Sequence, residues 1–280
     1  MNFLSLDERL NDALIEDLGR GDITTDAIIR SLKSQNTTKV TARVIAREDL
    51  VLAGWPILVR TLRLLGEIEE KPAFSDGDCV SKDQTIGIIR GEPACLLKGE
   101  RVALNLFQRM CGIATETREF VNLVAHTRAR ILDTRKTTPL WRDLEKYAVR
   151  VGGGFSHRQG LDDGILIKEN HSVVAGGIAK AINACRERAS HFHRIEVEVR
   201  DLDELREALG AGADIVLLDN MSVEEVRQAV AIVNGRAQVE VSGGIRRANV
   251  AAYAEAGVDF ISLGALTHSY RARDITILFD

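Results

Sequence analysis

The sequence predicts an α/β protein with two domains, a sandwich-like α+β domain over residues 1–112 and a parallel α/β barrel over residues 113–280. The main observation is a repeat that begins near residue 129, in which each short apolar strand is followed by a helical stretch. Residues 1 to about 92 lack this repeat and mix helical spacing with alternating strands. The repeated strand segments are ARILDT, GILIKEN, RIEVEV, DIVLLDN, AQVEVSGG and DFISLGA. These units indicate a barrel of about six parallel strands.

The pattern in residues 1 to about 92 changes between helical and strand-like spacing, as expected of a small α+β domain. The strand-like stretches alternate apolar and polar residues, so antiparallel pairing with one buried face is expected. The predicted elements are a helix over residues 4–18 that ends at Gly19, a turn at 19–25, a half-buried strand over 39–47, a helix over 55–65, a tight turn at 75–78 and a strand over 85–90.

A long helical region follows, and it opens at Pro93, a residue favoured in the first turn of a helix. Gly99 and Gly112 lie inside this region, and we expect the helix to break at both because glycine disfavours helix interiors. The boundary between the two domains is therefore expected within this region.

The length and composition fit a globular protein with a substantial core, since 45% of the 280 residues are hydrophobic. The net charge of −4 argues against general binding to nucleic acid. No apolar run reaches the roughly 20 residues of a membrane helix and the N-terminal segment does not resemble a signal peptide, so we expect a cytoplasmic protein without membrane association. The cysteines are far apart, which predicts reduced thiols and neither a zinc site nor disulfides: Cys79, Cys95, Cys111 and Cys185.

Polar or glycine-rich groups follow all the strands of the repeat. Because the carboxyl ends of parallel strands meet at one edge, these groups are expected to lie together where α/β barrels hold their active sites. Cationic donors are concentrated at residues 133–138 and 155–160, and they suit carboxylates and phosphates, so we predict a ligand with several negative charges. In chain order the groups are Arg135 with Lys136, Lys168, Glu198, Asp219, Ser242 with Gly243 and Gly244, and Gly264.

Three carboxylates in this repeat are candidates for contact with the ligand. Glu196 and Glu198 lie two apart in a strand, so both are expected to face the barrel interior. Buried carboxylates are costly unless they meet a cation, a metal or hydroxyls, so at least one should contact the ligand or Lys168. The alternative for each is a salt bridge without a ligand. Asp219 is a candidate for sugar hydroxyls or a hydrated magnesium ion, and a helix N-cap is its alternative role.

The loops offer binding groups whose roles the sequence leaves open. Backbone N–H groups of residues 242–244 precede a helix expected to start near Arg246, and with Gly264 they match the phosphate site of barrels, although ordinary turn glycines are the alternative. His157 and Arg158 follow a triple glycine and are predicted to clamp a carboxylate, with an exposed pair as the alternative. Lys168 has two candidate roles, a Schiff base and an anion ligand, and the nearby cations favour the second.

A series of ordered motifs over nearly the whole chain resembles the quinolinate phosphoribosyltransferase family of NAD biosynthesis. The motifs are GDITT at 21–25, GERVALN at 99–105, TRKTTP at 134–139, LEKYAV at 144–149, GGGFSHRQGL at 152–161, LIKENH at 166–171, EVEV at 196–199, LLDN at 217–220, VSGGI at 241–245 and SLGALTHS at 262–269. The resemblance implies an incomplete, open barrel after the N-terminal domain, with a C-terminal tail from about residue 266 that packs back on that domain. It also implies a homodimer, or a larger assembly such as a hexamer, with active sites shared between subunits.

The resemblance further implies roles for individual residues. Arg101 would reach the partner's site, and Arg135, His157 and Arg158 would hold quinolinate. The implied catalytic residues are Lys136 and Lys168, facing the pyrophosphate or a substrate carboxylate, and Glu198 and Asp219, facing the ribose and Mg²⁺, the metal being held indirectly through phosphates and water. The other implied substrate-binding residues are Thr134, Ser242, Gly243, Gly244, Leu263, Gly264, Ala265 and His268.

The implied reaction transfers phosphoribosyl from phosphoribosyl pyrophosphate to quinolinate with decarboxylation, giving nicotinate mononucleotide, CO₂ and pyrophosphate. One alternative is the relative encoded with molybdate-transport systems, which shares the RKT and GGG..HR elements but lacks LEKYAV and LIKENH. The others are a non-catalytic anion-binding protein and a phosphosugar aldolase that uses Lys168. The chain departs from the family pattern at Leu140-Trp141, where Gly-Leu is usual, at Val151, Ser156 and Glu169, where Cys, Asn and Asp are common, and at Tyr270-Arg271, where Ala-Pro is usual.

Overall fold

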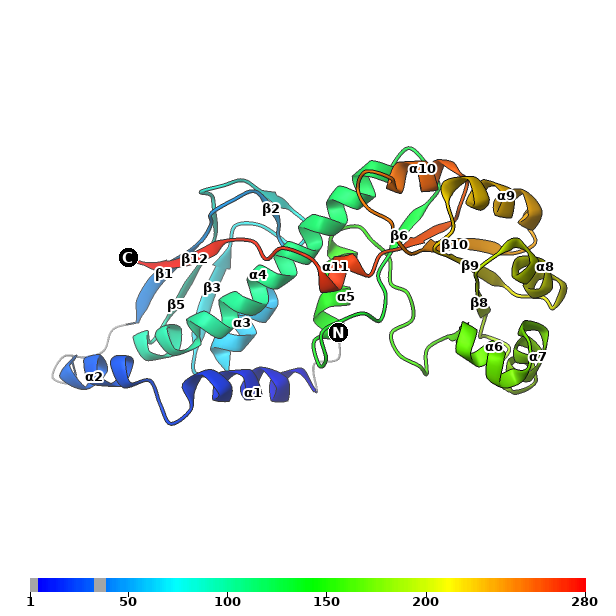
Figure 1. Ribbon diagram of the computed structural model, residues 1–280. Helices are drawn as coiled ribbons and strands as arrows, with labels where there is room; N and C mark the ends of the chain where they lie inside the picture. The colour runs from blue at the N-terminus through cyan, green and yellow to red at the C-terminus, as the bar shows by residue number, and fades with distance from the viewer. Residues whose placement is uncertain (1–4, 33–38) are drawn as a thin grey trace. The chain divides into compact units, whose positions relative to one another are not determined.

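The structure is a computed structural model that describes residues 5–32 and 39–280, so Leu4 of the first predicted helix lies outside the described residues. The chain falls into two compact units. Unit 1 is formed by residues up to 116, 138–153 and 269–280, and unit 2 by residues 117–137 and 154–268. Each unit gathers segments that are far apart in the sequence, as the colours in Figure 1 show.

Unit 1 is built on an antiparallel sheet of four strands in the order β12-β1-β5-β3. Strand β1 pairs on both sides, with Ala42 lying opposite Phe279 on β12 and opposite Ile89 on β5. The alternation in residues 39–47 thus correctly predicted a half-buried antiparallel strand, since Ala42 and Val44 are fully buried in the core. The strands of unit 1 are β1 (Val40–Ala46), β3 (Ile68–Pro72), β5 (Thr85–Gly91) and β12 (Ile275–Phe279), with a separate two-stranded sheet of β2 (Leu50–Val51) and β4 (Cys79–Val80).

Two helices precede this sheet and one follows its first strand. Helix α1 (Leu6–Leu18) buries the apolar stripe Leu6, Leu10 and Leu14 and ends at Gly19 with φ 52°, as predicted. The turn expected over residues 19–25 is shorter than predicted, because α2 (Ile23–Leu32) already begins within it. Asp22 Oδ1 accepts a hydrogen bond from the Thr25 backbone N–H at 2.9 Å, and this N-terminal cap starts the helix. Helix α3 (Trp55–Arg63) lies where the spacing predicted it.

Helix α4 (Pro93–Val124) is continuous over 32 residues, so the predicted breaks at Gly99 and Gly112 are wrong. Both glycines serve close packing. A Cβ atom on Gly99 would lie 2.8 Å from Leu62 Cδ2, and one on Gly112 would lie 3.0 Å from the Ala272 backbone. Neighbouring segments therefore occupy the space of the missing side chains, and this packing outweighs the roughly 1 kcal/mol that glycine costs in a helix. Helix α5 (Arg142–Val151) completes unit 1.

Unit 2 is built on a sheet of six parallel strands in the order β6-β11-β10-β9-β8-β7, which confirms the predicted number of strands. Strands β6 and β7 are its two edges, so the sheet is open. Beyond β6 it is extended by a single parallel bridge between Leu132 and Phe155. The strands are β6 (Arg130–Leu132), β7 (Ile165–Ile167), β8 (Ile195–Val199), β9 (Ile215–Asp219), β10 (Gln238–Ser242) and β11 (Phe260–Ser262).

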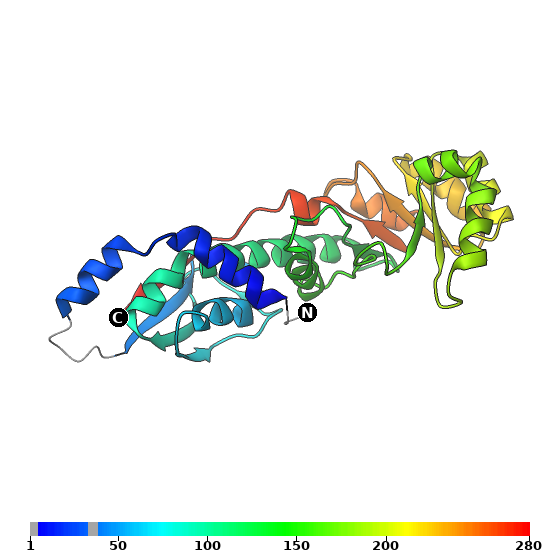
Figure 2. The same ribbon diagram turned by 90° about the horizontal axis from the view of Figure 1, so that it is seen from below.

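Neighbouring helices cover one face of this sheet, and Figures 1 and 2 show α7 to α10 side by side along it. The helices of unit 2 are α6 (Glu169–Ala175), α7 (Ile178–Arg188), α8 (Leu202–Gly210), α9 (Val223–Val233), α10 (Val250–Glu255) and α11 (Ala265–His268). Helix α10 begins later than the expected position near Arg246. The Asn249 side chain accepts a hydrogen bond from Arg246 N at 2.7 Å and donates one to Gly244 O at 3.2 Å, so residues 246–249 form a turn.

Candidate functional site

A pocket of about 340 Å³ lies in unit 2 and is lined by residues from all six strands or the loops directly after them, and by His157 and Arg158 from the segment before β7. Alternation along β8 explains how charge enters it: Val197 is fully buried, whereas Glu198 lies on the opposite face and lines the pocket. The parallel sheet thus brings together residues predicted from five of the six strand ends, while Gly264, predicted at the sixth, does not line the pocket. The residues lining the pocket are Thr134, Arg135, Lys136, His157, Arg158, Leu166, Lys168, Glu198, Leu217, Asp219, Glu240, Ser242 and Ser262.

Arg135 and Arg158 are two pocket cations with unsatisfied hydrogen-bonding capacity. The Nε atom of each is buried and has no hydrogen-bond partner among the described residues. Arg158 Nη1 donates to Gly164 O at 3.0 Å, which fixes one end of its guanidinium group. Burial, and then the neighbouring positive charge of Arg135, lower the pKa of Arg158, while Glu196 raises it. Two arginines that repel each other and retain unused donors form a site suited to an anion with more than one charge.

Lys168 follows β7 and forms an ion pair with Glu198 Oε2. The lysine side chain is 48% exposed and the glutamate side chain 16% exposed. The prediction that an interior carboxylate contacts Lys168 is confirmed by this pair. The pair engages Oε2 of Glu198. Because Glu198 also lines the pocket, its other carboxylate oxygen remains available to a ligand.

Asp219 is positioned by Asn220, a residue to which we had assigned no role. Asn220 Nδ2 donates to Asp219 Oδ2 at 2.8 Å, and its backbone N–H donates to Ser242 O at 2.9 Å. Asn220 has φ 56°, a conformation that asparagine tolerates better than most residues. The alternative role of Asp219 as a helix N-cap is wrong, because Ser222 caps α9. The signal in the sequence was an asparagine directly after the last residue of an apolar strand.

The glycines near Ser242 and Gly264 permit close approach of neighbouring groups. Gly243 has φ 92°, and a Cβ atom there would lie 2.6 Å from Asn220 Cγ. A Cβ atom on Gly264 would lie 2.9 Å from Lys136 Cδ and 3.1 Å from His268 Nε2. Ser242 lines the pocket, whereas the other residues predicted near the phosphates do not: Gly243, Gly244, Leu263, Gly264, Ala265 and His268.

The loop after β6 is shaped by local hydrogen bonds. Thr134 Oγ1 accepts from Lys136 N at 3.0 Å, and Thr267 Oγ1 donates to Lys136 O at 2.8 Å. Helix α11, which carries Thr267, therefore holds the backbone of this loop. Arg101 is the predicted site residue that does not belong to this group: it is exposed, lies on α4 in unit 1 and does not line the pocket.

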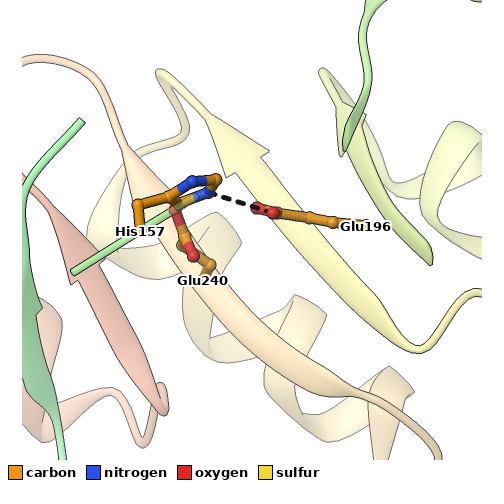
Figure 3. A group of neighbouring side chains, drawn as sticks. All are labelled: His157, Glu196 and Glu240. Carbon is orange, nitrogen blue, oxygen red and sulfur yellow. Dashed lines mark ion pairs between the residues drawn. The ribbon is translucent and has the colours of Figure 1, made fainter. Parts of the chain in front are cut away.

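His157 lines the pocket and also belongs to a buried group with Glu196 and Glu240 (Figure 3). Its Nε2 atom lies 3.0 Å from Glu196 Oε2 and 3.6 Å from Glu240 Oε1. Burial, and then the charge of Glu196, raise the pKa of Glu240 to about 8. Glu240 was not predicted as a site residue. The available signal was the alternation in QVEVS, which matches that of IEVEV and places this glutamate on the interior face.

The comparison with protein families decides the relationship of this chain. A family described as the quinolinate phosphoribosyl transferase C-terminal domain matches residues 113–278, and one described as its N-terminal domain matches residues 22–111. The chain belongs to the quinolinate phosphoribosyl transferase family.

Members of the quinolinate phosphoribosyl transferase family resemble the chain over nearly its full length. A protein of Bacillus subtilis named probable nicotinate-nucleotide pyrophosphorylase (carboxylating) is 42% identical, over 99% of this chain and 94% of its own. A Mycobacterium leprae protein named nicotinate-nucleotide pyrophosphorylase (carboxylating) is 40% identical, over 96% of this chain and 95% of its own. The solved structure of the nicotinate-nucleotide pyrophosphorylase from Francisella tularensis has a TM-score of 0.91 at 40% identity. The match covers 98% of this chain and 96% of that chain. The family resemblance inferred from ordered motifs is thereby confirmed.

Within residues 5–32 and 39–280, no helix combines the length and apolar character that a transmembrane helix requires.

Proposed function

We propose that the protein is a quinolinate phosphoribosyltransferase, which transfers the phosphoribosyl group of phosphoribosyl pyrophosphate to quinolinate with decarboxylation. The products are nicotinate mononucleotide, CO₂ and pyrophosphate, a reaction of NAD biosynthesis. The names of the Bacillus subtilis and Mycobacterium leprae relatives support this assignment. The proposal includes a cytoplasmic location, because the substrates are charged metabolites of central metabolism.

The observation that carries the proposal is the charge arrangement of the pocket. Arg135 and Arg158 present buried Nε donors that have no partner within residues 5–32 and 39–280, and Lys136 and Lys168 add two further cations. Quinolinate carries two carboxylates on neighbouring ring carbons, so it can use more cations than a single carboxylate can. Charge-assisted bonds to arginine are among the stronger hydrogen bonds in proteins. The site therefore fits quinolinate better than nicotinate.

The carboxylates of the pocket suit the second substrate. The quinolinate ring nitrogen attacks the anomeric carbon of the ribose as pyrophosphate leaves, and positive charge develops on the ribose ring. Glu198 and Asp219 lie at the ends of adjacent strands and would stabilise that charge and bind ribose hydroxyls. Lys136, Ser242 and the loop of residues 263–265 would hold the phosphates, with His268 beside them.

Decarboxylation then requires no nucleophile from the protein. When the adjacent carboxylate leaves as CO₂, its bonding electron pair stays on the ring carbon, where the positive charge of the pyridinium nitrogen stabilises it, and a proton added to that carbon completes the product. Arg135 and Arg158 would hold the second carboxylate and keep the ring oriented during both steps. A Schiff base at Lys168 has no part in this sequence, in keeping with its pairing to Glu198.

Mg²⁺ is part of the proposal, and the donor set of the pocket fits it. Glu198 and Asp219 supply carboxylate oxygens, the ligand type that Mg²⁺ prefers, and each has one oxygen engaged by a neighbouring residue. Each carboxylate therefore retains capacity toward an ion that also keeps water and substrate phosphates as ligands. When bound, the ion would neutralise charge on the departing pyrophosphate.

The proposal also includes a homodimer with shared sites. Arg101 is exposed on α4 and absent from the lining of the pocket in its own chain. An arginine supplied by the partner subunit would add a further cation for the quinolinate carboxylates, as the family resemblance implies. Assembly into a hexamer is compatible with such a dimer.

One incubation separates this proposal from its alternatives. The purified protein is mixed with quinolinate, phosphoribosyl pyrophosphate and Mg²⁺, and nicotinate mononucleotide and CO₂ are measured. Formation of both products at equal rates is expected, with little turnover when nicotinate replaces quinolinate. Binding of quinolinate without product would indicate a non-catalytic anion-binding protein. Irreversible labelling of Lys168 by a sugar phosphate and borohydride would indicate an aldolase.

A further inference from the structure

His157 stands apart from the other predicted quinolinate ligands, because both of its ring nitrogens are already engaged within the protein. The backbone N–H of Arg158 donates to His157 Nδ1 at 2.7 Å. The other nitrogen, Nε2, lies 3.0 Å from Glu196 Oε2 (Figure 3). The backbone N–H of His157 itself donates to Asp133 Oδ1 at 2.9 Å. The ring is thus held at both nitrogens, and the backbone of His157 is held by Asp133.

These contacts determine which nitrogen carries a proton. A backbone N–H can only donate, so Nδ1 of His157 must present a lone pair to Arg158. The ring proton is then on Nε2, where it points to Glu196. A positively charged ring would carry protons on both nitrogens, and the one on Nδ1 would face the N–H group of Arg158 at 2.7 Å. The contacts therefore hold the ring neutral.

From these contacts we infer that His157 is a positioning residue for Arg158, held as the neutral Nε2–H tautomer by Glu196 and Glu240, and that it is not a cationic ligand of the substrate carboxylate. This inference rests on the proposed function for the identity of the substrate. The tautomer itself follows from contacts within the protein alone.

The group formed by His157, Glu196 and Glu240 is almost completely buried, which restricts the motion of its side chains. Glu196 is 5% exposed, Glu240 is 1% exposed, and the His157 side chain is 11% exposed. The Ser262 hydroxyl donates to Glu240 Oε1. Because the pKa of Glu240 is raised to about 8, chiefly by burial, this residue is largely protonated at neutral pH. Burial and the charge of Arg135 lower the pKa of Arg158, and Glu196 acts on it in the opposite direction.

These contacts fix the position of Arg158. Its backbone is held by His157 Nδ1, its Nη1 by Gly164 O, and its buried Nε has no partner among the described residues. A rotation of the imidazole would release the backbone N–H of Arg158 and shift the guanidinium group relative to Arg135. Glu196 can thus influence the recognition of an anion through His157.

The same three side chains could be taken for a metal site, since their ligand atoms lie within 4.8 Å of one another and Glu196 Oε1 is buried without a partner among the described residues. The tautomer argues against it. A neutral histidine that binds a metal through Nε2 carries its proton on Nδ1, and here Nδ1 accepts the N–H group of Arg158. Metal binding would therefore break the bond that positions Arg158.

The tautomer can be measured without substrates. The full-length protein is labelled with ¹⁵N-histidine, and the ring nitrogens are observed by NMR between pH 6 and 8. His157→Asn assigns the signal among the six histidines, since the asparagine oxygen can still accept from Arg158 N. We expect a neutral Nε2–H ring across this range. A charged ring at pH 7, or a proton on Nδ1, overturns the inference.

A kinetic comparison tests the positioning role. Glu196→Gln replaces a charge-assisted hydrogen bond by a neutral one, so we expect the KM for quinolinate to rise about fivefold with little change in kcat or in the KM for phosphoribosyl pyrophosphate. The matched control is Glu255→Gln, because Glu255 makes an exposed pair of similar length, 3.1 Å, with His126. The control should leave both KM values unchanged. An equal rise in both KM values for Glu196→Gln, or no rise, contradicts the role.

The metal alternative and the proposed function have separate outcomes. Stoichiometric binding of Zn²⁺ by the dialysed wild-type protein, lost in His157→Asn, would identify a metal site and overturn the inference. If the protein binds quinolinate without turning it over, the proposed function fails, while the NMR measurement still decides the tautomer.

Discussion

Replacing Leu140 by glycine should stabilise the protein, an unusual result for a substitution that removes a whole side chain. Leu140 has φ 68°, a left-handed conformation that costs a non-glycine residue about 1–2 kcal/mol. Its residue exposure is 73%, so little buried surface is lost with the side chain. The contact that Arg9 makes here is with the backbone oxygen of Leu140, and glycine retains it.

The expected magnitude is a difference of two effects. Relief of the backbone strain contributes about 1–2 kcal/mol, and the greater freedom of glycine in the unfolded chain takes back about 0.4–1 kcal/mol. The net gain is about 0.5–1 kcal/mol, equivalent to roughly 1–3 °C in the melting temperature of a chain of this size. Leucine at position 140 is therefore expected to destabilise the fold locally.

Leu140→Ala is the matched control, because it removes most of the same exposed atoms but keeps the Cβ atom that causes the strain. We expect its free energy of unfolding to stay within about 0.5 kcal/mol of the wild type. Thermal and urea unfolding of the three proteins would be measured side by side. If the glycine variant is no more stable than the alanine variant, the strain assigned to Leu140 is absent and the reasoning is refuted.

Four further predictions concern the site. Arg158→Ala should weaken quinolinate binding about ten- to a hundredfold by titration calorimetry, since a charge-assisted bond contributes roughly 1.5–3 kcal/mol, and equal turnover of quinolinate and nicotinate by the wild type would contradict this. Asp219→Ala should lose activity with an almost unchanged melting temperature, and unchanged kinetics across a magnesium titration would show that this carboxylate is only structural. Mixed Arg101→Ala and Lys136→Ala subunits should recover roughly a quarter of normal activity, because about half of the dimers are mixed and half of their sites are intact. Verified subunit exchange without recovery would place Arg101 in its own chain's site. The folded protein binds the Glu240 proton more tightly than the unfolded chain does, because the pKa of Glu240 is raised to about 8. The free energy of unfolding is therefore highest below the ordinary pKa of glutamate and falls as the pH rises toward 8. The wild type should therefore lose stability relative to Glu240→Gln as the pH rises from 5.5 to 8.5. A difference in the free energy of unfolding that stays constant over this range would refute the assigned pKa.

The sequence predicted the pocket residues well where they follow directly from strand periodicity. Lys168, Glu198 and Asp219 come at or just after strand ends, and parallel strands must bring such residues to one edge. Their partners were harder to predict. The Lys168–Glu198 pair was one of several options, because a sequence pattern gives the face of a strand and not the distance between two side chains.

Errors arose where tertiary packing overrides a local preference. Gly99 and Gly112 have the composition of a helix break, but the segments packed against them leave no room for a side chain. The orientation of the His157 ring, in contrast, could not be predicted from the sequence. The direction of its ring depends on Glu196 and Glu240, which come from two other strands, and no spacing near residue 157 carries that information.

The strand order has a consequence for how the chain is made. In both sheets a strand near the start of the unit pairs with one from near its end: β1 with β12, and β6 with β11. During synthesis, β6 must wait until residue 262 has left the ribosome, and β1 until residue 279. Until then each exposes an unpaired edge that can pair with another chain. Loss of the last strand, whether by a nonsense codon or by proteolysis, would thus leave an edge of the N-terminal sheet uncovered and favour aggregation of the nascent protein.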